Sequence, residues 1–350
     1  MKDKKQNKRI NGGHRLLFFC ILCLFGLYVA VSYAEEQPQR EQSKTKVILL
    51  HTDNLTYDQY RHPGAQILTG NVQFQHDGVL MYCDSACFYE ATNSFDAFGH
   101  VKMVQGDTLD LVGDMLLYNG LDQLARVRHN VVLTHRESKL YTDSLDYDRL
   151  YELGYFFEGG KLVDKDNVLT SDWGQYSPPT RQAVFNYNVK LENPKFTLIS
   201  DTLNYNTLTS MAEIVGPSNI DSGDNHIYSE SGFYNTQTEE AILLDRSIVT
   251  NKGRKMVGDS LYYDSKSGVG EGFRNVVYTD EVNKNMLTGN YCYYNDSTGY
   301  SMATDSAVAI DYSQRDTMYM HADTFKVYTF YMDTDSMYRE VRGYHKVRSY

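Results

Sequence analysis

A short acidic motif returns along the sequence at a nearly constant interval, and this repeat restricts the fold more than any other feature. Its clearest copy spans residues 200–206, which read Ser-Asp-Thr-Leu-Asn-Tyr-Asn. Successive copies are 29 or 30 residues apart, and their acidic residues are Asp84, Asp114, Asp143, Asp172, Asp201, Glu230 and Asp259. A fixed interval of this size is typical of stacked or wound architectures, in which one unit cannot bury its own apolar face.

A second element recurs between these copies, so each repeat holds two predicted strands. It begins with a small or polar pair followed by Val, and it occupies residues 70–74, 99–103, 129–133, 187–191 and 274–278. The chain has 30 Tyr and 6 Pro residues, and aromatic side chains suit a pleated, half-buried surface. No stretch of 12 residues has a helical period. The sequence therefore predicts an all-β fold.

The alternation inside each strand predicts which side chains face inward. Side chains in a strand point to opposite faces with a period of two residues. Asp201, Leu203 and Tyr205 are therefore expected on one face, and Thr202 and Asn204 on the other. A repeat of about 29 residues buries too little on its own to offset about 1.5 kcal/mol of ordering entropy per residue. Stacking should thus form one apolar stripe, either as a packed core or as an open groove.

Three segments are expected along the chain. Residues 1–34 have the pattern of a signal peptide, with six basic residues before an apolar run at 16–31 and small residues at 32–34. An uncleaved anchor is the alternative, although a 16-residue helix spans only about 24 Å of about 30 Å of hydrocarbon. Residues 35–46 are polar and aperiodic, which predicts a linker. The repeat array then covers 47–350, where the last ten residues resemble the start of an incomplete copy.

Charge and motif spacing argue against several function classes. The net charge is −11, and the predicted signal segment holds six of the basic residues and one acidic residue. Binding to a phosphate backbone needs clustered Lys and Arg, so nucleic acid is not an expected partner. The ten His residues have no metal-ligand spacing, and no catalytic set can be assigned. The recurring Asp residues are better explained by hydrogen bonds to neighbouring backbone N–H groups than by a metal or catalytic ladder. No enzyme activity, cofactor or metal is expected.

The repeated motifs resemble those of the OstA-like family. The closest matches are residues 68–72, 83–86, 105–109 and 258–263, and the resemblance covers about residues 47–350. The family includes periplasmic bridge proteins of lipopolysaccharide transport and the N-terminal domain of the outer-membrane translocon. It implies a stacked antiparallel β-jellyroll whose apolar interior shields the acyl chains of lipid A. It also implies a periplasmic location next to the outer or inner membrane, and partners among other bridge jellyrolls or further copies of the chain, joined end to end by strand addition.

The resemblance implies that inward apolar side chains contact lipid, whereas ordinary core packing is the competing interpretation. The candidate lipid-binding residues are Leu55, Tyr57, Phe74, Phe88, Met103, Leu116, Tyr118, Leu133, Leu145, Tyr147, Leu191, Leu203, Tyr205, Leu261 and Tyr263. Two functions of other classes remain open. One is a β-solenoid that binds or degrades polysaccharide, which would need carboxylates and bases converging in one cleft. The other is a surface scaffold or adhesin with a filled interior.

Overall fold

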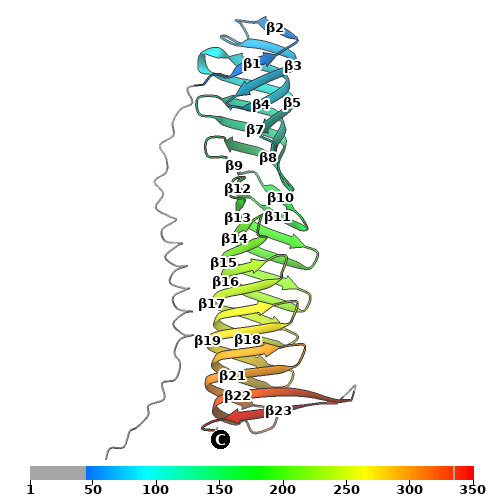
Figure 1. Cartoon of the computed structure of the whole chain (residues 1–350), viewed down its shortest axis with the longest axis vertical. Coiled ribbons are helices and arrows are strands. Elements are labelled where there is room, and N and C mark those ends of the chain that lie inside the picture. Colours follow the sequence, from blue (N-terminus) through cyan, green and yellow to red (C-terminus); the bar gives the residue numbers. More distant parts are fainter. Residues whose placement is uncertain (1–44, 334–335) are drawn as a thin grey trace, which may run out of the picture. The chain divides into compact units, whose positions relative to one another are not determined.

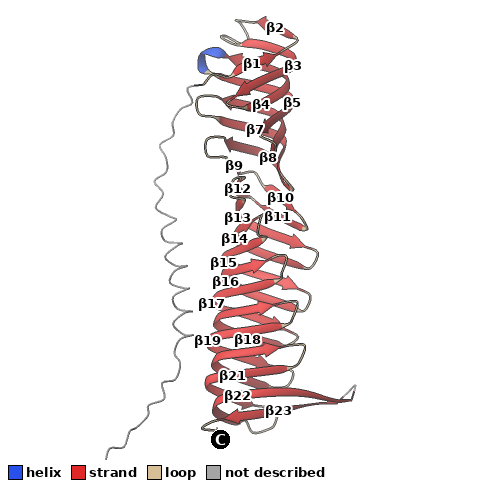
Figure 2. Cartoon of the chain, in the orientation of Figure 1, coloured by secondary structure: helices blue, strands red, loops and turns tan. Residues whose placement is uncertain are grey.

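The computed structural model describes residues 45–333 and 336–350, which belong to one compact unit. The predicted signal segment and all of the predicted linker except its last two residues lie outside this part of the chain. Figures 1 and 2 show a stack of strands, and a single short 3-10 helix, η1 (Glu90–Thr92), is present in the described stretch. The prediction of an all-β fold is therefore confirmed. In the described part of the chain, no helix has the length and hydrophobicity needed to cross a membrane.

The strands in residues 45–333 and 336–350 form one antiparallel sheet of 24 members. The first repeats contain β1 (Ile48–His51), β2 (Asn54–Tyr57), β3 (Gln66–His76), β4 (Val79–Tyr89), β5 (Ser94–Gln105), β6 (Leu109–Asn119), β7 (Leu124–His135) and β8 (Ser138–Asp148). The middle contains β9 (Leu153–Phe156), β10 (Gly160–Asp164), β11 (Asn167–Ser171), β12 (Trp173–Ser177), β13 (Gln182–Asn193), β14 (Phe196–Asn206), β15 (Met211–Ser222) and β16 (Asn225–Asn235). The last repeats contain β17 (Glu240–Asn251), β18 (Arg254–Asp264), β19 (Val269–Asp280), β20 (Asn285–Asn295), β21 (Tyr300–Asp311), β22 (Met318–Asp333), β23 (Ser336–Tyr344) and β24 (Arg348–Ser349).

Most repeats contribute a hairpin of two strands of 11 or 12 residues, as the two recurring motifs predict. β13 and β14 are one such pair, with Phe185 opposite Leu203 and Leu191 opposite Leu198. In the middle of the stack the two strands of one repeat are interrupted, so that β9 and β10 both pair with β8 while β11 and β12 both pair with β13. The repeat therefore continues through this interruption.

Every long strand bends at a corner, and the bend corrects one prediction. In β14 the buried positions run through Leu198 and Ser200 and then resume at Leu203 and Tyr205, so the alternation changes phase. The pairing with β15 shifts its register at the same place. Asp201 lies in this shift and is exposed, so the prediction that it shares the inner face is wrong. A period of two residues holds only while a strand stays straight.

The second recurring motif supplies the other side of each corner. Tyr187 and Asn188 of β13 both have positive φ, at 64° and 52°, a left-handed conformation that Asn and Gly adopt most readily. The Asn188 side chain donates a hydrogen bond of 2.7 Å to Asp172. Asn130 bonds Asp114 at 2.6 Å in the same way. Most acidic residues of the motif thus take part in corner hydrogen bonds with side chains: Asn amides bond Asp114, Asp172 and Asp259, and imidazoles bond Asp84 and Asp143. The predicted bond from a backbone N–H group is present at Asp143, where Asn130 donates.

We expect Asn188→Ala to lower the stability of the stack by about 1–2 kcal/mol, because Ala pays the left-handed backbone cost and cannot bond Asp172. Asn188→Gly removes the same hydrogen bond but relieves the backbone, so its loss should be smaller. Thermal unfolding of the two variants measures the difference. Equal losses would show that the hydrogen bond, and not the backbone conformation, selects Asn at the corner.

Contacts between hairpin turns show that the sheet folds back on itself. A strand of 11 residues is about 35 Å long, and Lys195 and Glu239 lie in turns at opposite ends of such strands. The Lys195 ammonium nevertheless lies 2.6 Å from the Glu239 carboxylate. The corner therefore brings the two rows of turns together, which gives the cross-section of a β-jellyroll. We call the line where the two rows meet the seam, formed by His76, Arg149, Asp164, Lys195, Glu239 and Asp280 among others.

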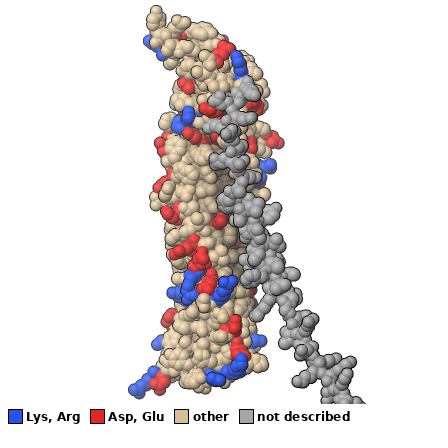
Figure 3. All heavy atoms as spheres, turned by 90° about the vertical axis from the view of Figure 1, so that its left-hand side faces the viewer, with Lys and Arg blue, Asp and Glu red and all other residues tan. Residues whose placement is uncertain are grey.

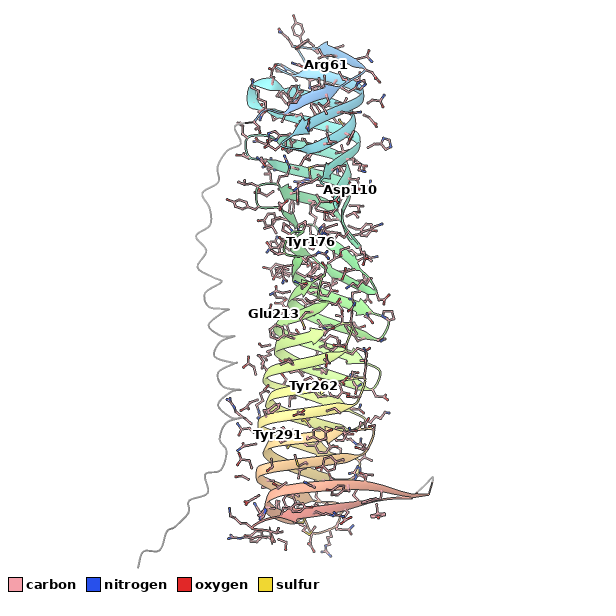
Figure 4. The ribbon with its side chains drawn as sticks, in the orientation of Figure 1. Arg61, Asp110, Tyr176, Glu213, Tyr262 and Tyr291 are labelled. Atoms are coloured by element: carbon pink, nitrogen blue, oxygen red, sulfur yellow. The ribbon has the colours of Figure 1, made fainter. Side chains whose placement is uncertain are left out.

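The enclosed interior is apolar over nearly the whole length of the stack. One cluster of buried hydrophobic side chains extends from Val47 to Phe325 without a break. Its largest members are fully buried aromatic residues, including Tyr176 of β12, which Figure 4 labels. Of the two interpretations that periodicity leaves open, a packed core describes most of the interior.

Candidate functional site

Most of the predicted inward residues lie together in this interior. The buried members of the predicted set are Phe74, Phe88, Met103, Leu116, Tyr118, Leu133, Leu145, Tyr147, Leu191, Leu203, Tyr205, Leu261 and Tyr263. Two of their aromatic rings contact each other, since the ring centroids of Phe74 and Phe88 lie 5.5 Å apart. Their placement on the inner face follows the predicted alternation, and their contact with lipid remains a proposal.

Leu55 and Tyr57 of β2 are different, because their side chains are 44% and 66% exposed. The register places Leu55 opposite Leu68, which is buried, so the alternation gives Leu55 the correct face. However, β2 pairs only with β3 in the described part of the chain. No further strand among the described residues covers it, and the expectation that these two residues line an enclosed interior is wrong.

The seam is polar, in contrast to the interior that it closes. At its first cluster the His76 Nδ1 lies 2.7 Å from the Tyr118 hydroxyl, and the Arg149 guanidinium donates to that hydroxyl and to the His76 carbonyl. Burial lowers the pKa of His76 and outweighs the opposing attraction of Asp77. The imidazole is therefore neutral near pH 7 and acts as a hydrogen-bonding group rather than as a charge.

The second seam cluster surrounds a carboxylate in the middle of the stack. Asp164 is buried and accepts hydrogen bonds of 2.7 Å from both Ser138 and Tyr205. Asn167 donates to the same Tyr205 hydroxyl and to Thr236. Burial, with the Asp164 carboxylate next in importance, raises the pKa of Tyr205, so this phenol stays protonated and remains a donor. These bonds hold the two rows of turns together.

The third cluster lies near the C-terminal end of the stack. Asp280 is fully buried and pairs with Arg339 of β23 at 2.9 Å and with Arg254 of β18 at 3.6 Å. Arg254 also contacts Asp296 at 2.8 Å. Burial alone would raise the pKa of Asp280, but hydrogen bonds from Asn283 and the ion pair with Arg339 outweigh it and lower the pKa. The Asp280 carboxylate is therefore ionised, and together with Asp296 it balances the charges of Arg254 and Arg339.

Sequence reasoning missed the seam, although a signal for it exists. His76, His135, Asp164, Asn193 and Asp280 each end a strand just before a turn, and successive seam positions keep the repeat interval. A polar residue at the end of a strand is ordinary in a turn, so its burial is visible only once the two rows of turns are brought together.

The interior becomes hollow beside the third cluster. A cavity of about 370 Å³ lies among β18 to β23, with apolar walls that include Met286, Leu287, Ala309, Met320 and Val327. Arg254 and Arg339 stand at its polar side. Ala309 is the small residue in this wall, and sequence reasoning did not single it out.

The outer surface carries charge of both signs. On the face in Figure 3 acidic and basic side chains are interspersed. In residues 45–333 and 336–350 no group of three or more His, Cys, Asp or Glu residues is arranged to hold a metal ion. The apolar interior and the cavity are features that this part of the chain offers to a ligand.

One of the comparisons with known proteins identifies the family. A search of the curated proteins finds no match. Among solved structures the chain resembles LptH from Pseudomonas aeruginosa, described as the LptA homologous periplasmic component of the conserved lipopolysaccharide transport device. The two are 16% identical with a TM-score of 0.29, over 31% of this chain and 82% of LptH. The profile described as OstA-like protein matches residues 44–201 and 197–259. Because this match spans more than half of the sequence, the chain belongs to the OstA-like family.

Proposed function

We propose that this protein carries lipopolysaccharide through the periplasm, with the acyl chains of lipid A shielded in the jellyroll interior. The observation that carries the proposal is the unbroken apolar cluster along the stack, from Val47 to Phe325, enclosed by a polar seam. Family membership supports it. The polar outer surface would stay in water while the interior replaces water around the lipid.

The energetic reason for such a carrier is the cost of exposing hydrocarbon to water. An acyl chain of about 12 carbons costs on the order of 10 kcal/mol to hydrate, at about 0.8 kcal/mol for each methylene. A lipid with several chains costs several times as much. A continuous apolar interior removes this barrier and needs no bond-making chemistry. Directional movement must be driven by another component, because a passive interior cannot transport against a gradient.

Lipid can enter only if the seam opens, because inner side chains fill the space between the two halves of the sheet, which face each other on either side of the corner. We call these halves the two arms of the sheet. Tyr118, Tyr147 and Tyr205 are fully buried in the closed form. The Lys195–Glu239 contact lies near solvent, and water can replace it at modest cost. The buried contacts of Asp164 and Asp280 must also break, and they account for most of the cost of opening. Opening the two arms would then expose an apolar groove along the stack.

The ends of the stack support the proposed partners. β2 pairs only with β3, and β23 pairs only with β22, within the part of the chain that is described. Unpaired strand edges recruit further strands. Other jellyroll proteins of a transport bridge, or further copies of this chain, would extend the interior in both directions. The protein would act in the periplasm next to the outer or inner membrane.

A photocrosslinking experiment in cells tests the lipid path. An aliphatic diazirine residue replaces Leu203, which faces the interior, or Ile199, which is on the same strand and 51% exposed. We expect lipopolysaccharide to be captured at position 203 and not at position 199. The diazirine residue is similar in size to both Leu203 and Ile199. The two variants therefore differ mainly in whether the crosslinker faces the interior or the solvent.

Capture at neither position by the folded, exported protein would overturn the carrier proposal and favour a scaffold. Capture of polysaccharide without lipid at position 199 would favour a carbohydrate-binding surface. Equal capture of lipopolysaccharide at both positions would also contradict the proposal, because it would indicate attachment to the outer surface rather than passage through the interior.

A further inference from the structure

The cavity near the C-terminal end differs from the rest of the interior. It has a volume of about 370 Å³, within the range of about 300–1,000 Å³ that is usual for small-molecule pockets. It lies among β18 to β23, mostly beyond residue 259, where the family match ends. Elsewhere along the stack the corresponding space is filled by aromatic and aliphatic side chains. Family membership therefore does not account for this feature.

The hollow arises from a change in side-chain size at equivalent inner positions. Leu191, Ile220 and Val249 occupy one inner position in successive repeats, and all three are buried. In β21 the position is taken by Ala309, which the register places between Leu287 and Met320. Ala303 and Ala307 are buried on the same strand. Replacing large side chains by Ala leaves space unless the surroundings collapse, and here they have not collapsed.

The chemistry of the wall selects an uncharged, apolar occupant. Met286, Leu287, Met320 and Val327 supply apolar surface, and Met side chains adapt to flexible ligands. The two cations at the polar side are already neutralised, because Arg254 and Arg339 both pair with Asp280 and Arg254 also contacts Asp296. An anionic group would compete with these carboxylates, so the cavity is not built for a phosphate.

The cavity has access to solvent. Two of its lining residues, Met318 of β22 and Val341 of β23, are 43% and 44% exposed. In Figure 1 the hairpin of β22 and β23 extends past the neighbouring strands at this end of the stack. Its Arg339 pairs with Asp280 of β19 at 2.9 Å. A chain could therefore enter beside Met318 and Val341 without disturbing the packed aromatic residues farther along.

We propose that this cavity binds one hydrocarbon chain of an amphiphile, with the polar end of the ligand at the surface near Met318 and Val341. This inference rests on the proposed function. It identifies the cavity as the position in the interior that a hydrocarbon chain reaches first from solvent. At about 0.8 kcal/mol for each buried methylene, a chain that fills the cavity gains enough to hold it there. The seam can stay closed while this position is occupied.

Ala309→Phe tests the proposal by filling the cavity from its wall. Val308→Phe is the matched control, because Val308 is the neighbouring residue on the same strand and points to the opposite face. The probe is dodecanoic acid with a diazirine on its terminal carbon, irradiated with the purified protein. We expect the label on peptides that contain Met286, Leu287 or Met320. Ala309→Phe should reduce this label at least tenfold, and Val308→Phe should leave it within twofold.

Thermal unfolding of both variants shows whether they fold, and Ala309→Leu provides a smaller filling if the Phe variant does not. Undiminished labelling of folded Ala309→Phe or Ala309→Leu would overturn the cavity as a binding site. Label on residues 198–205 with none at the cavity would also overturn it, while leaving the carrier function intact. Absence of label throughout the protein, together with no capture of lipopolysaccharide in cells, would overturn both.

Discussion

Leu203→Asp is expected to prevent folding of the stack, whereas Ile199→Asp on the same strand should leave it folded. Leu203 is fully buried, while Ile199 is exposed on β14. Losing the Leu side chain costs about 2–5 kcal/mol, and burying a carboxyl group without a partner adds at least about 2 kcal/mol. At Ile199 the new carboxylate stays in water. Circular dichroism and the thermal midpoint measure the difference.

Comparing Leu203→Asp with Ile199→Asp also distinguishes a packed interior from an open groove. If Leu203→Asp unfolds with the same midpoint as Ile199→Asp, the region around Leu203 is wet and the interior is an open groove even without lipid. A large loss confined to Leu203→Asp agrees with an interior that is packed until the seam opens. The second result is expected, because the side chains of β14 alternate between buried and exposed on both sides of the corner.

The local features of the fold could be predicted because they depend on neighbouring residues. A period of two residues placed Leu203 and Tyr205 on the inner face, and the 29-residue interval predicted stacked hairpins. The same reasoning failed at Asp201, where the corner shifts the register. It also failed for Leu55 and Tyr57, because their burial depends on a further strand that would cover β2.

The seam and the cavity could not be predicted because they depend on long-range contacts. Lys195 meets Glu239 across 44 residues, and their pairing exists only after the sheet has folded back on itself. The cavity reflects the combined volume of several strands. Ala309 alone does not predict it, since a small residue is often compensated by a larger neighbour. The repeat interval predicts which residues face the interior. It does not predict how much space remains between the inner side chains that face each other.

Asp280→Asn should destabilise the C-terminal part of the stack by about 3 kcal/mol, near the lower end of the range for breaking a buried ion pair. Asn keeps the volume but leaves Arg254 and Arg339 facing each other without the carboxylate. Their side chains are 28% and 20% exposed, which allows water to reduce the cost. Hydrogen exchange of β19 to β23 and the thermal midpoint measure the effect. Asp224→Asn is the control, because Asp224 pairs with Lys252 at an exposed site where the loss should stay below about 1 kcal/mol.

The pH dependence of the stability difference between the wild type and Asp280→Asn provides a second test. The folded-state pKa of Asp280 is lowered, so its ion pairs contribute fully above the unfolded value of about 3.9. That contribution is lost only as pH falls through the lower folded pKa. The gap between the wild type and Asp280→Asn should therefore be constant from about pH 5 to pH 8 and narrow below about pH 4. A gap that closes near pH 6, or one no larger than that of Asp224→Asn, would show that the Asp280–Arg339 pair does not hold the last hairpin in place.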